Sequence, residues 1–286
     1  MEIKSDLIRG LKEIFFDEIR YSKNLKLRFL GRILPVKNYL AKKYAKRCLT
    51  SNIRNFSYCK LNDNSISKKE ILNNLINDGL SNKFLISEDH INKILEKLST
   101  LKFKPNIGNQ EFTYNEIMSG NYLKDVLQYR LFSPNKFIKE VEEIIFDEQI
   151  LEIAKAYLGV EPKIENCVIW ISLPTDKDTS GENLYGYHYD IDDYKFLKLF
   201  VYLNDVDENS GPHSYIKKSL NDKSIYKSIR RRLSYKNVHK RYPNKEEVLT
   251  GKKGTGFFED TYGYHKGTLP KKYRVILQCQ YTINKL

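Results

Sequence analysis

The fold is decided by residues 186–220, GYHYDIDDYKFLKLFVYLNDVDENSGPHSYIKKSL, where short apolar runs alternate with turn residues. Successive side chains of a strand point to opposite faces, so His188 and Asp190, two residues apart, can reach one point in space. The apolar run 196–203 is typical of a buried strand, and the Asn-Asp and Gly-Pro pairs after it indicate turns. This stretch therefore predicts strands that carry polar side chains toward a common site.

Three further segments, 167–173, 255–259 and 273–283, have the same short apolar character and are predicted strands. Several short strands without long helices between them favour a sandwich or a barrel. The exception is segment 217–253, which is polar and basic and is expected to form helix or loop. Two helices are predicted upstream, over 88–99 and about 148–158, because their apolar residues recur at helical spacing. The expected fold class is mainly β with flanking helices.

A metal ion would need a third protein ligand besides His188 and Asp190. The best candidate is His265 in GYHKGTLPKKYR, and His213, which follows Gly-Pro, is the alternative. Two histidines and one carboxylate on one face of a metal leave three positions open, as in non-haem Fe(II) oxygenases. Ligand bonds are about 2 Å long, so ring nitrogens of residues 188 and 265 more than about 6 Å apart would exclude a shared ion.

The open positions suggest a co-substrate. Two of them suit a bidentate 2-oxo acid and the third suits dioxygen. Arg274 begins the last predicted strand, nine residues after His265. Its guanidinium could hold the distal carboxylate of 2-oxoglutarate through a forked pair of hydrogen bonds.

The ordered set of HxD, KLFVYLNDVDENSGPH and GTGFFEDTYGYHKG, followed by an arginine, resembles the phytanoyl-CoA dioxygenase family over about residues 75–286. The resemblance implies a double-stranded β-helix (a cupin-like jelly roll) with N-terminal helices. It also implies Fe(II) held by His188, Asp190 and His265, and 2-oxoglutarate as co-substrate. The implied reaction couples decarboxylation of 2-oxoglutarate to hydroxylation of an unactivated C–H bond. Relatives that halogenate lack the carboxylate, so Asp190 favours hydroxylation.

The chain departs from the family pattern two residues after the distal histidine. The family often has Ser or Thr there, whereas this chain has Gly267, with Thr268 next. Thr268 and Lys198 are therefore predicted co-substrate contacts in addition to Arg274. Three aromatic residues are assigned equally to a substrate pocket and to the core: Trp170, Tyr185 and Tyr187.

Charge gives the expectation about partners. The chain has 286 residues, 49 Lys+Arg against 36 Asp+Glu and a formal net charge of +13, which favours an anionic partner. Segment 217–253 holds thirteen Lys/Arg and three Asp/Glu. It is either a solvated face or a surface that captures an anionic substrate, such as an acyl-CoA, a nucleotide sugar or a glycolipid. The expected domains are a basic helical extension over 1–60 and a catalytic jelly roll over 61–286. The extension packs on that domain or contacts an anionic membrane surface.

The remaining features concern compartment and competing functions. Four scattered cysteines without a CxxC spacing argue against a disulfide framework or structural zinc, and the start of the chain, which lacks a continuous apolar run, is not expected to be a signal peptide. A cytoplasmic setting is expected. The competing function is a basic jelly-roll protein that binds nucleic acid, or an oxygenase that acts on it. No RRM, KH, helix-turn-helix or zinc-finger pattern supports binding of nucleic acid.

Overall fold

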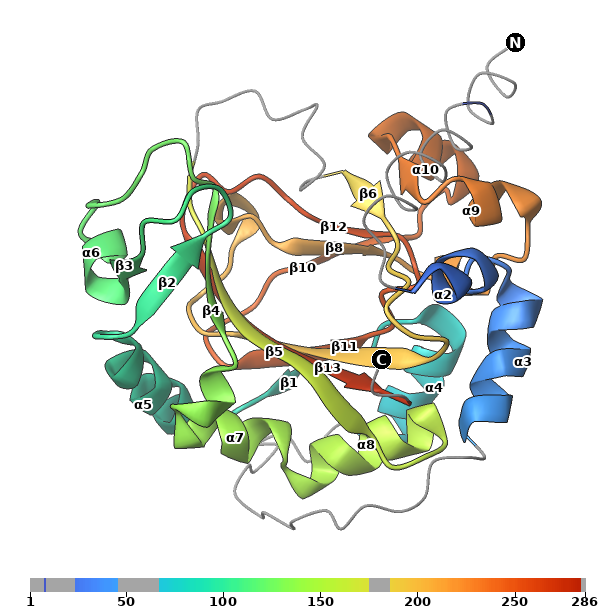
Figure 1. Cartoon of the computed structure of the whole chain (residues 1–286), viewed down its shortest axis with the longest axis horizontal. Coiled ribbons are helices and arrows are strands. Elements are labelled where there is room, and N and C mark those ends of the chain that lie inside the picture. The colour runs from blue at the N-terminus through green and yellow to red at the C-terminus, as the bar shows by residue number, and fades with distance from the viewer. Residues whose placement is uncertain (1–7, 9–23, 46–66, 175–185, 284–286) are drawn as a thin grey trace.

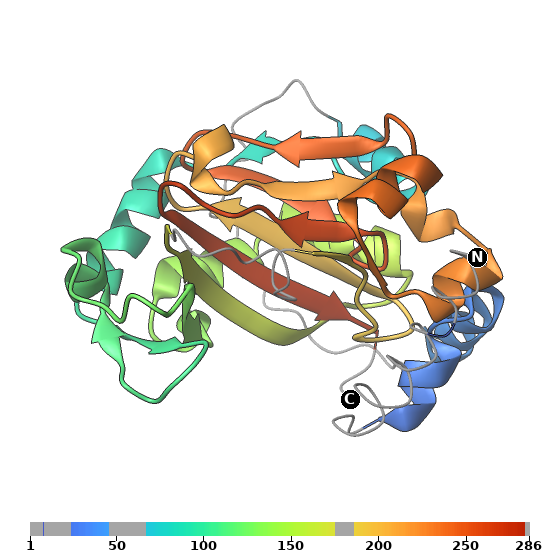
Figure 2. The ribbon, with the colours of Figure 1, turned by 90° about the horizontal axis from the view of Figure 1, so that it is seen from above.

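The computed structural model describes residues 8, 24–45, 67–174 and 186–283. They form two facing antiparallel sheets flanked by helices, as Figure 1 shows. This confirms the expected jelly roll. Viewed from above in Figure 2, the strands run across the molecule, with α2 and α3 in blue at one end.

The larger sheet contains the strands that the apolar runs predicted. Its central strand β13 pairs with β7 on one side and with β5 on the other. In sheet order the strands are β1 (Phe84–Leu85), β11 (Thr255–Glu259), β7 (Phe196–Tyr202), β13 (Arg274–Thr282), β5 (Lys163–Ser172), β4 (Gln128–Phe132), β2 (Lys102–Pro105) and β3 (Phe112–Thr113).

The smaller sheet carries the predicted ligands and corrects one expectation. Segment 217–253 is not only helix and loop, because it supplies both edge strands of this sheet. The edges form by pairing with strands distant in sequence, and local apolar pattern does not reveal that. In order the strands are β10 (Glu246–Leu249), β8 (His213–Ile216), β12 (His265–Gly267), β6 (Tyr187–His188) and β9 (Arg232–Leu233).

The two faces of β13 divide the core. Leu277 and Cys279 belong to the cluster that also contains the apolar faces of the outer helices, whereas Ile276 packs between the sheets with Phe200 and Tyr215. Alternation along the strand therefore directs Arg274, two residues before Ile276, into the space between the sheets.

The helices cover the larger sheet and one end of the molecule. In Figure 1, α5, α7 and α8 lie along the outer side of the larger sheet, and α9 and α10 lie near α2. No helix of the described ranges has the length and apolarity needed to cross a membrane. The helices are α2 (Leu25–Leu30), α3 (Leu34–Ala45), α4 (Lys68–Asp78), α5 (Glu88–Leu98), α6 (Tyr114–Met118), α7 (Lys139–Ile145), α8 (Glu148–Leu158), α9 (Ile225–Ile229) and α10 (Tyr235–Arg241).

Both predicted helices are present. The Asp147 side chain accepts hydrogen bonds from the backbone N–H groups of Gln149 and Ile150, and Gly159 ends α8 in the left-handed region. Ser87 precedes α5 but makes no side-chain capping bond. Helix boundaries were predictable because caps and apolar spacing are local properties of the sequence.

Helices α2 and α3 of the basic N-terminal segment pack against the loop that precedes His265. The Tyr262 hydroxyl donates to the Arg32 carbonyl at 2.9 Å, and the Lys37 ammonium lies over the Tyr262 ring at 4.2 Å. Lys227 of the basic segment 217–253 lies over the same ring at 4.0 Å and is 1% exposed. Lys37 and Lys227 are therefore buried between elements, and neither belongs to a solvated face.

Candidate metal centre

Strand pairing brings the two predicted histidine ligands together. His188 ends β6 and His265 begins β12, and the two residues are direct partners in the antiparallel pair. Side chains of such partners lie on one face, and these ring centroids are 4.4 Å apart. The site is thus assembled from segments almost eighty residues apart in sequence.

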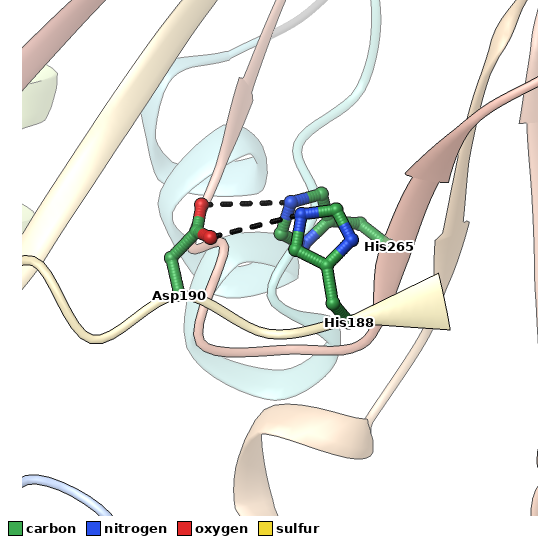
Figure 3. Close-up of side chains that lie close together, drawn as sticks. All are labelled: His188, Asp190 and His265. Carbon is green, nitrogen blue, oxygen red and sulfur yellow. Dashed lines mark ion pairs between the residues drawn. The ribbon is translucent and has the colours of Figure 1, made fainter. Parts of the chain in front are cut away.

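Asp190 completes a group of three. Its backbone N–H donates to the Thr261 carbonyl at 2.7 Å, which fixes the chain just beyond β6. One carboxylate oxygen lies 3.8 Å from His188 Nε2 and the other 3.5 Å from His265 Nε2, as the dashed lines in Figure 3 show. The three donor atoms lie within 4.8 Å of one another. They satisfy the distance condition set from the sequence for sharing one ion.

Backbone carbonyls fix the tautomer of both imidazoles. His188 Nδ1 lies 2.9 Å from the Gly186 carbonyl, and His265 Nδ1 lies 3.0 Å from the Gly263 carbonyl. A carbonyl only accepts, so each Nδ1 carries the proton and each Nε2 lone pair faces Asp190. Burial lowers the pKa of His188 to about 3 and also lowers that of His265. Both rings are therefore neutral at pH 7, the state that binds a metal ion.

Lys198 compensates the buried carboxylate. Its ammonium lies 2.7 Å from Asp190 Oδ2 and 3.0 Å from Asp192 Oδ2. Burial opposes the charge, but the two carboxylates prevail and raise the pKa of Lys198. The lysine therefore stays charged and donates a hydrogen bond to Oδ2 of Asp190. Its contact with a co-substrate stays a prediction.

Arg274 and Thr268 differ in what their side chains contact. The buried Arg274 guanidinium donates to the Gly211 carbonyl and, at 3.4 Å, to the Ser172 hydroxyl. The Thr268 hydroxyl donates to the Pro212 carbonyl at 2.8 Å. Thr268 thus secures the loop before β8, and its role toward a co-substrate stays a prediction.

The chain is similar in fold to several solved structures. No protein-family model matches the chain, and no curated protein sequence matches it. HygX from Streptomyces hygroscopicus, solved with nickel and 2-oxoglutarate bound, is 9% identical with a TM-score of 0.52, over 76% of this chain and 87% of HygX. EctD from S. alaskensis, solved with 2-oxoglutarate and 5-hydroxyectoine, is 14% identical with a TM-score of 0.51, over 83% of this chain and 85% of EctD.

A third structure, the epimerase SnoN in complex with Fe3+, alpha ketoglutarate and nogalamycin RO, is 10% identical with a TM-score of 0.51. The match covers 75% of this chain and 83% of SnoN. The chain shares the jelly-roll fold of HygX, EctD and SnoN. At such low identity the likeness establishes the jelly roll, and the chemistry must be argued from the side chains of this chain.

His213 and Glu259 form a buried pair beside the predicted ligands. His213 Nε2 lies 2.8 Å from Glu259 Oε2, and the His213 ring stacks on Phe200. The three-residue group contains His265 and not the alternative ligand His213. Burial raises the pKa of Glu259 to about 8. Sequence reasoning missed Glu259; the available signal was a charged residue that ends the apolar run 255–259.

The aromatic candidates separate by strand face. Tyr187 precedes His188 on β6, is buried, and its hydroxyl donates to Glu246. It points away from the ligand face and belongs to the core. Trp170 packs against the cluster between the sheets. Tyr185 lies outside the described residues.

Proposed function

We propose that this protein is a non-haem Fe(II)/2-oxoglutarate-dependent oxygenase that hydroxylates an anionic substrate. The observation that carries the proposal is the convergence of two neutral imidazoles and one carboxylate, with both Nδ1 atoms donating to carbonyls. The proposed iron ligands are His188, Asp190 and His265. Two histidines and a carboxylate with open positions are the donor set of this class of iron enzyme.

The charge state of the site suits a divalent ion. Asp190 supplies one negative charge, and the lowered pKa values of both histidines keep their lone pairs available. Lys198 holds one carboxylate oxygen, which leaves Oδ1 for coordination. Iron bound there would couple oxidative decarboxylation of 2-oxoglutarate to oxidation of a substrate C–H bond.

The role proposed for Arg274 is to bind the distal carboxylate of 2-oxoglutarate. Its buried guanidinium lies between the sheets. Little water reaches it there, so its hydrogen bonds to a carboxylate are stronger than they would be on the surface. HygX and EctD are both solved with 2-oxoglutarate bound. Thr268 would support this end of the pocket by holding the loop at Pro212.

The proposed substrate class is anionic, and the finer family assignment is to phytanoyl-CoA dioxygenase-like hydroxylases. Arg232 is the direct strand partner of His188, so its side chain shares the face of the proposed ligands. A cation beside the proposed ligands favours a negatively charged substrate. Retention of Asp190 favours hydroxylation. A reducing, cytoplasmic compartment is proposed from the scattered cysteines.

The deciding experiment is anaerobic titration of the protein with Fe(II) and then 2-oxoglutarate. We expect a weak visible charge-transfer band that saturates with one equivalent of each. Asp190→Ala should abolish the band, whereas Asp205→Ala, which removes an exposed carboxylate, should leave it unchanged. A wild-type protein that forms no band at millimolar 2-oxoglutarate would refute the proposal.

A further inference from the structure

Strand β4 extends the larger sheet beyond β5 and presents a second arginine to the space between the sheets. Arg130 is the direct partner of Trp170, and Trp170 is the direct partner of Ile276. Direct partners share a face, and Ile276 packs in the cluster between the sheets. Arg130 and Trp170 therefore line the same interior face as Arg274.

Arg130 and Trp170 form a stacked pair with unsatisfied donors. The guanidinium carbon lies 5.0 Å from the Trp170 ring centre, within cation–π range. Arg130 Nε and Trp170 Nε1 are both buried without a hydrogen-bond partner, while one terminal nitrogen of Arg130 donates to Gln128 Oε1 at 3.2 Å. A buried donor without an acceptor is costly, so two such donors side by side indicate a missing acceptor.

The missing acceptor is expected to be an anion. No carboxylate of the described residues pairs with Arg130, and burial alone lowers its pKa. Structural arginines at such positions are ordinarily compensated by an acid. The neighbours here are an indole, an amide and an apolar side chain, which supply no negative charge.

We propose that Arg130 and Trp170 form a subsite for a carboxylate or phosphate group of the substrate to be oxidised. This inference rests on the proposed function. The forked guanidinium binds two oxygens of the anion, and the indole N–H donates a further hydrogen bond. The Trp170 ring holds the guanidinium plane in place. One terminal nitrogen already donates to Gln128, so the guanidinium is oriented before the anion binds.

The subsite is separate from the proposed co-substrate contact. Gln128 and Ser172 are direct partners in the next row of the sheet, and Ser172 is the partner of Arg274 and accepts its hydrogen bond. In the sheet, the backbones of Arg130 and Arg274 are therefore two strands apart and lie in neighbouring rows. Arg274 is assigned to 2-oxoglutarate and Arg130 to the substrate.

The test uses the fluorescence of Trp170, which is the single tryptophan of the chain. The full chain is titrated with methyl phosphate and, separately, with acetate. Each titration is run on metal-free protein and on protein saturated with Ni(II) and 2-oxoglutarate. We expect a saturable change with at least one anion, and the stronger response identifies phosphate or carboxylate. Arg130→Gln should raise the Kd of that anion by about tenfold or more.

Two further variants make the result decisive. Arg130→Lys keeps the charge and should bind the anion with intermediate affinity because it lacks the fork. Lys136→Gln removes one charge from an exposed position and should leave the Kd unchanged. Absence of a saturable response in wild type, or equal Kd values for Arg130→Gln and Lys136→Gln, would overturn the subsite.

The metal-free arm separates this inference from the proposed function. An anion response that depends on Arg130, in a protein that binds no Fe(II) and 2-oxoglutarate, would retain the anion site and refute only the oxygenase assignment. Conversely, if Arg130→Gln weakens 2-oxoglutarate binding as strongly as it weakens the anion, Arg130 serves the co-substrate and the substrate subsite is wrong.

Discussion

The His188 and His265 imidazoles face each other across the β6–β12 pair, with ring centroids 4.4 Å apart and planes inclined at 52°. Their Nδ1 atoms are each bound to the carbonyl two residues earlier in the chain. The same hydrogen bond between a histidine and a backbone carbonyl thus occurs on two strands from distant segments. Both Nε2 atoms are directed at the same carboxylate. Five experiments test this arrangement and its surroundings.

Loss of the carboxylate should abolish metal-dependent turnover. In Asp190→Ala we expect iron-dependent production of succinate from 2-oxoglutarate to fall by about 100-fold or more, since residues beyond the ligands are already worth about 10–100-fold. Iron content after desalting and succinate yield measure the effect. Asp205→Ala is the control, because its carboxylate is exposed and pairs with the surface residue Lys252. Turnover by Asp190→Ala near the wild-type rate would contradict the ligand assignment.

Loss of Arg274 should weaken 2-oxoglutarate without removing iron. Arg274→Gln leaves the three ligands intact, so the iron content should persist while the apparent Kd for 2-oxoglutarate rises about tenfold or more. Thr268→Val should have a smaller effect, because its hydroxyl contacts the Pro212 carbonyl. The charge-transfer band reports both quantities. An unchanged Kd in Arg274→Gln would mean that the distal carboxylate binds elsewhere.

Lys198 should contribute more to the stability of the metal-free protein than to that of the metal-bound protein. Lys198→Met leaves the Asp190 charge buried without its cation, so the metal-free protein should lose about 3–5 kcal/mol of stability. Ni(II) should then raise the Tm of the variant by more than it raises that of wild type, because the ion replaces the missing charge. Thermal unfolding with and without Ni(II) measures this.

The matched control for Lys198 is Lys252→Met, since Lys252 pairs with Asp205 at 3.0 Å on the surface. Exposed pairs contribute about 0–1 kcal/mol, so its Tm should hardly move. Equal Ni(II) stabilisation of Lys198→Met and wild type would show that Lys198 and the metal do not act on the same carboxylate.

The buried histidines should make the metal-free protein sensitive to acid. Burial lowers the pKa of His188 and of His213 to about 3, against about 6.5 in the unfolded chain. Between these values the unfolded chain binds protons that the folded protein does not, so stability is lost as the pH falls from about 6.5 toward 3. Each such histidine adds a slope of about 1.4 kcal/mol per pH unit where only the unfolded form is protonated.

His213→Gln removes one of these titrations and keeps all three proposed ligands, although the His213 ring stacks on that of His265. Its free energy of unfolding should fall less steeply than that of wild type between pH 6 and 5, by up to the slope of one histidine. Urea unfolding of metal-free protein at the two pH values measures it. Parallel slopes in the two proteins would show that the folded protein protonates His213 as readily as the unfolded chain.

The close packing of the N-terminal helices should be intolerant of a single methyl group. A Cβ at Gly31 would lie 2.6 Å from the Leu27 carbonyl oxygen and 2.7 Å from Ile191 Cγ2, so Gly31→Ala should cost about 1–3 kcal/mol. Ile33→Ala, in the same connection but 44% exposed, should change stability by about 0.5 kcal/mol or less. A Tm of Gly31→Ala equal to that of wild type would mean that this segment does not pack on the Ile191 loop.

The sequence predicted those features that depend on local pattern. Apolar runs located β7, β11 and β13, and apolar residues at helical spacing located α5 and α8. The i, i+2 spacing of His188 and Asp190 indicated a shared site, and the motif order pointed to His265. The short edge strands β9 and β10 were missed, because their stability comes from pairing with β6 and β8 rather than from their own composition.

Tertiary structure alone decided what surrounds the predicted ligands. Lys198 and Asp190 are joined across the start of β7, Glu259 and His213 meet from different sheets, and Arg130 stacks on Trp170 because β4 aligns with β5. The sequence gives the types of the chemical groups and their order along the chain. The partners of these groups depend on strand register. The register results from many weak interactions over the whole sheet, so it cannot be predicted from neighbouring residues alone.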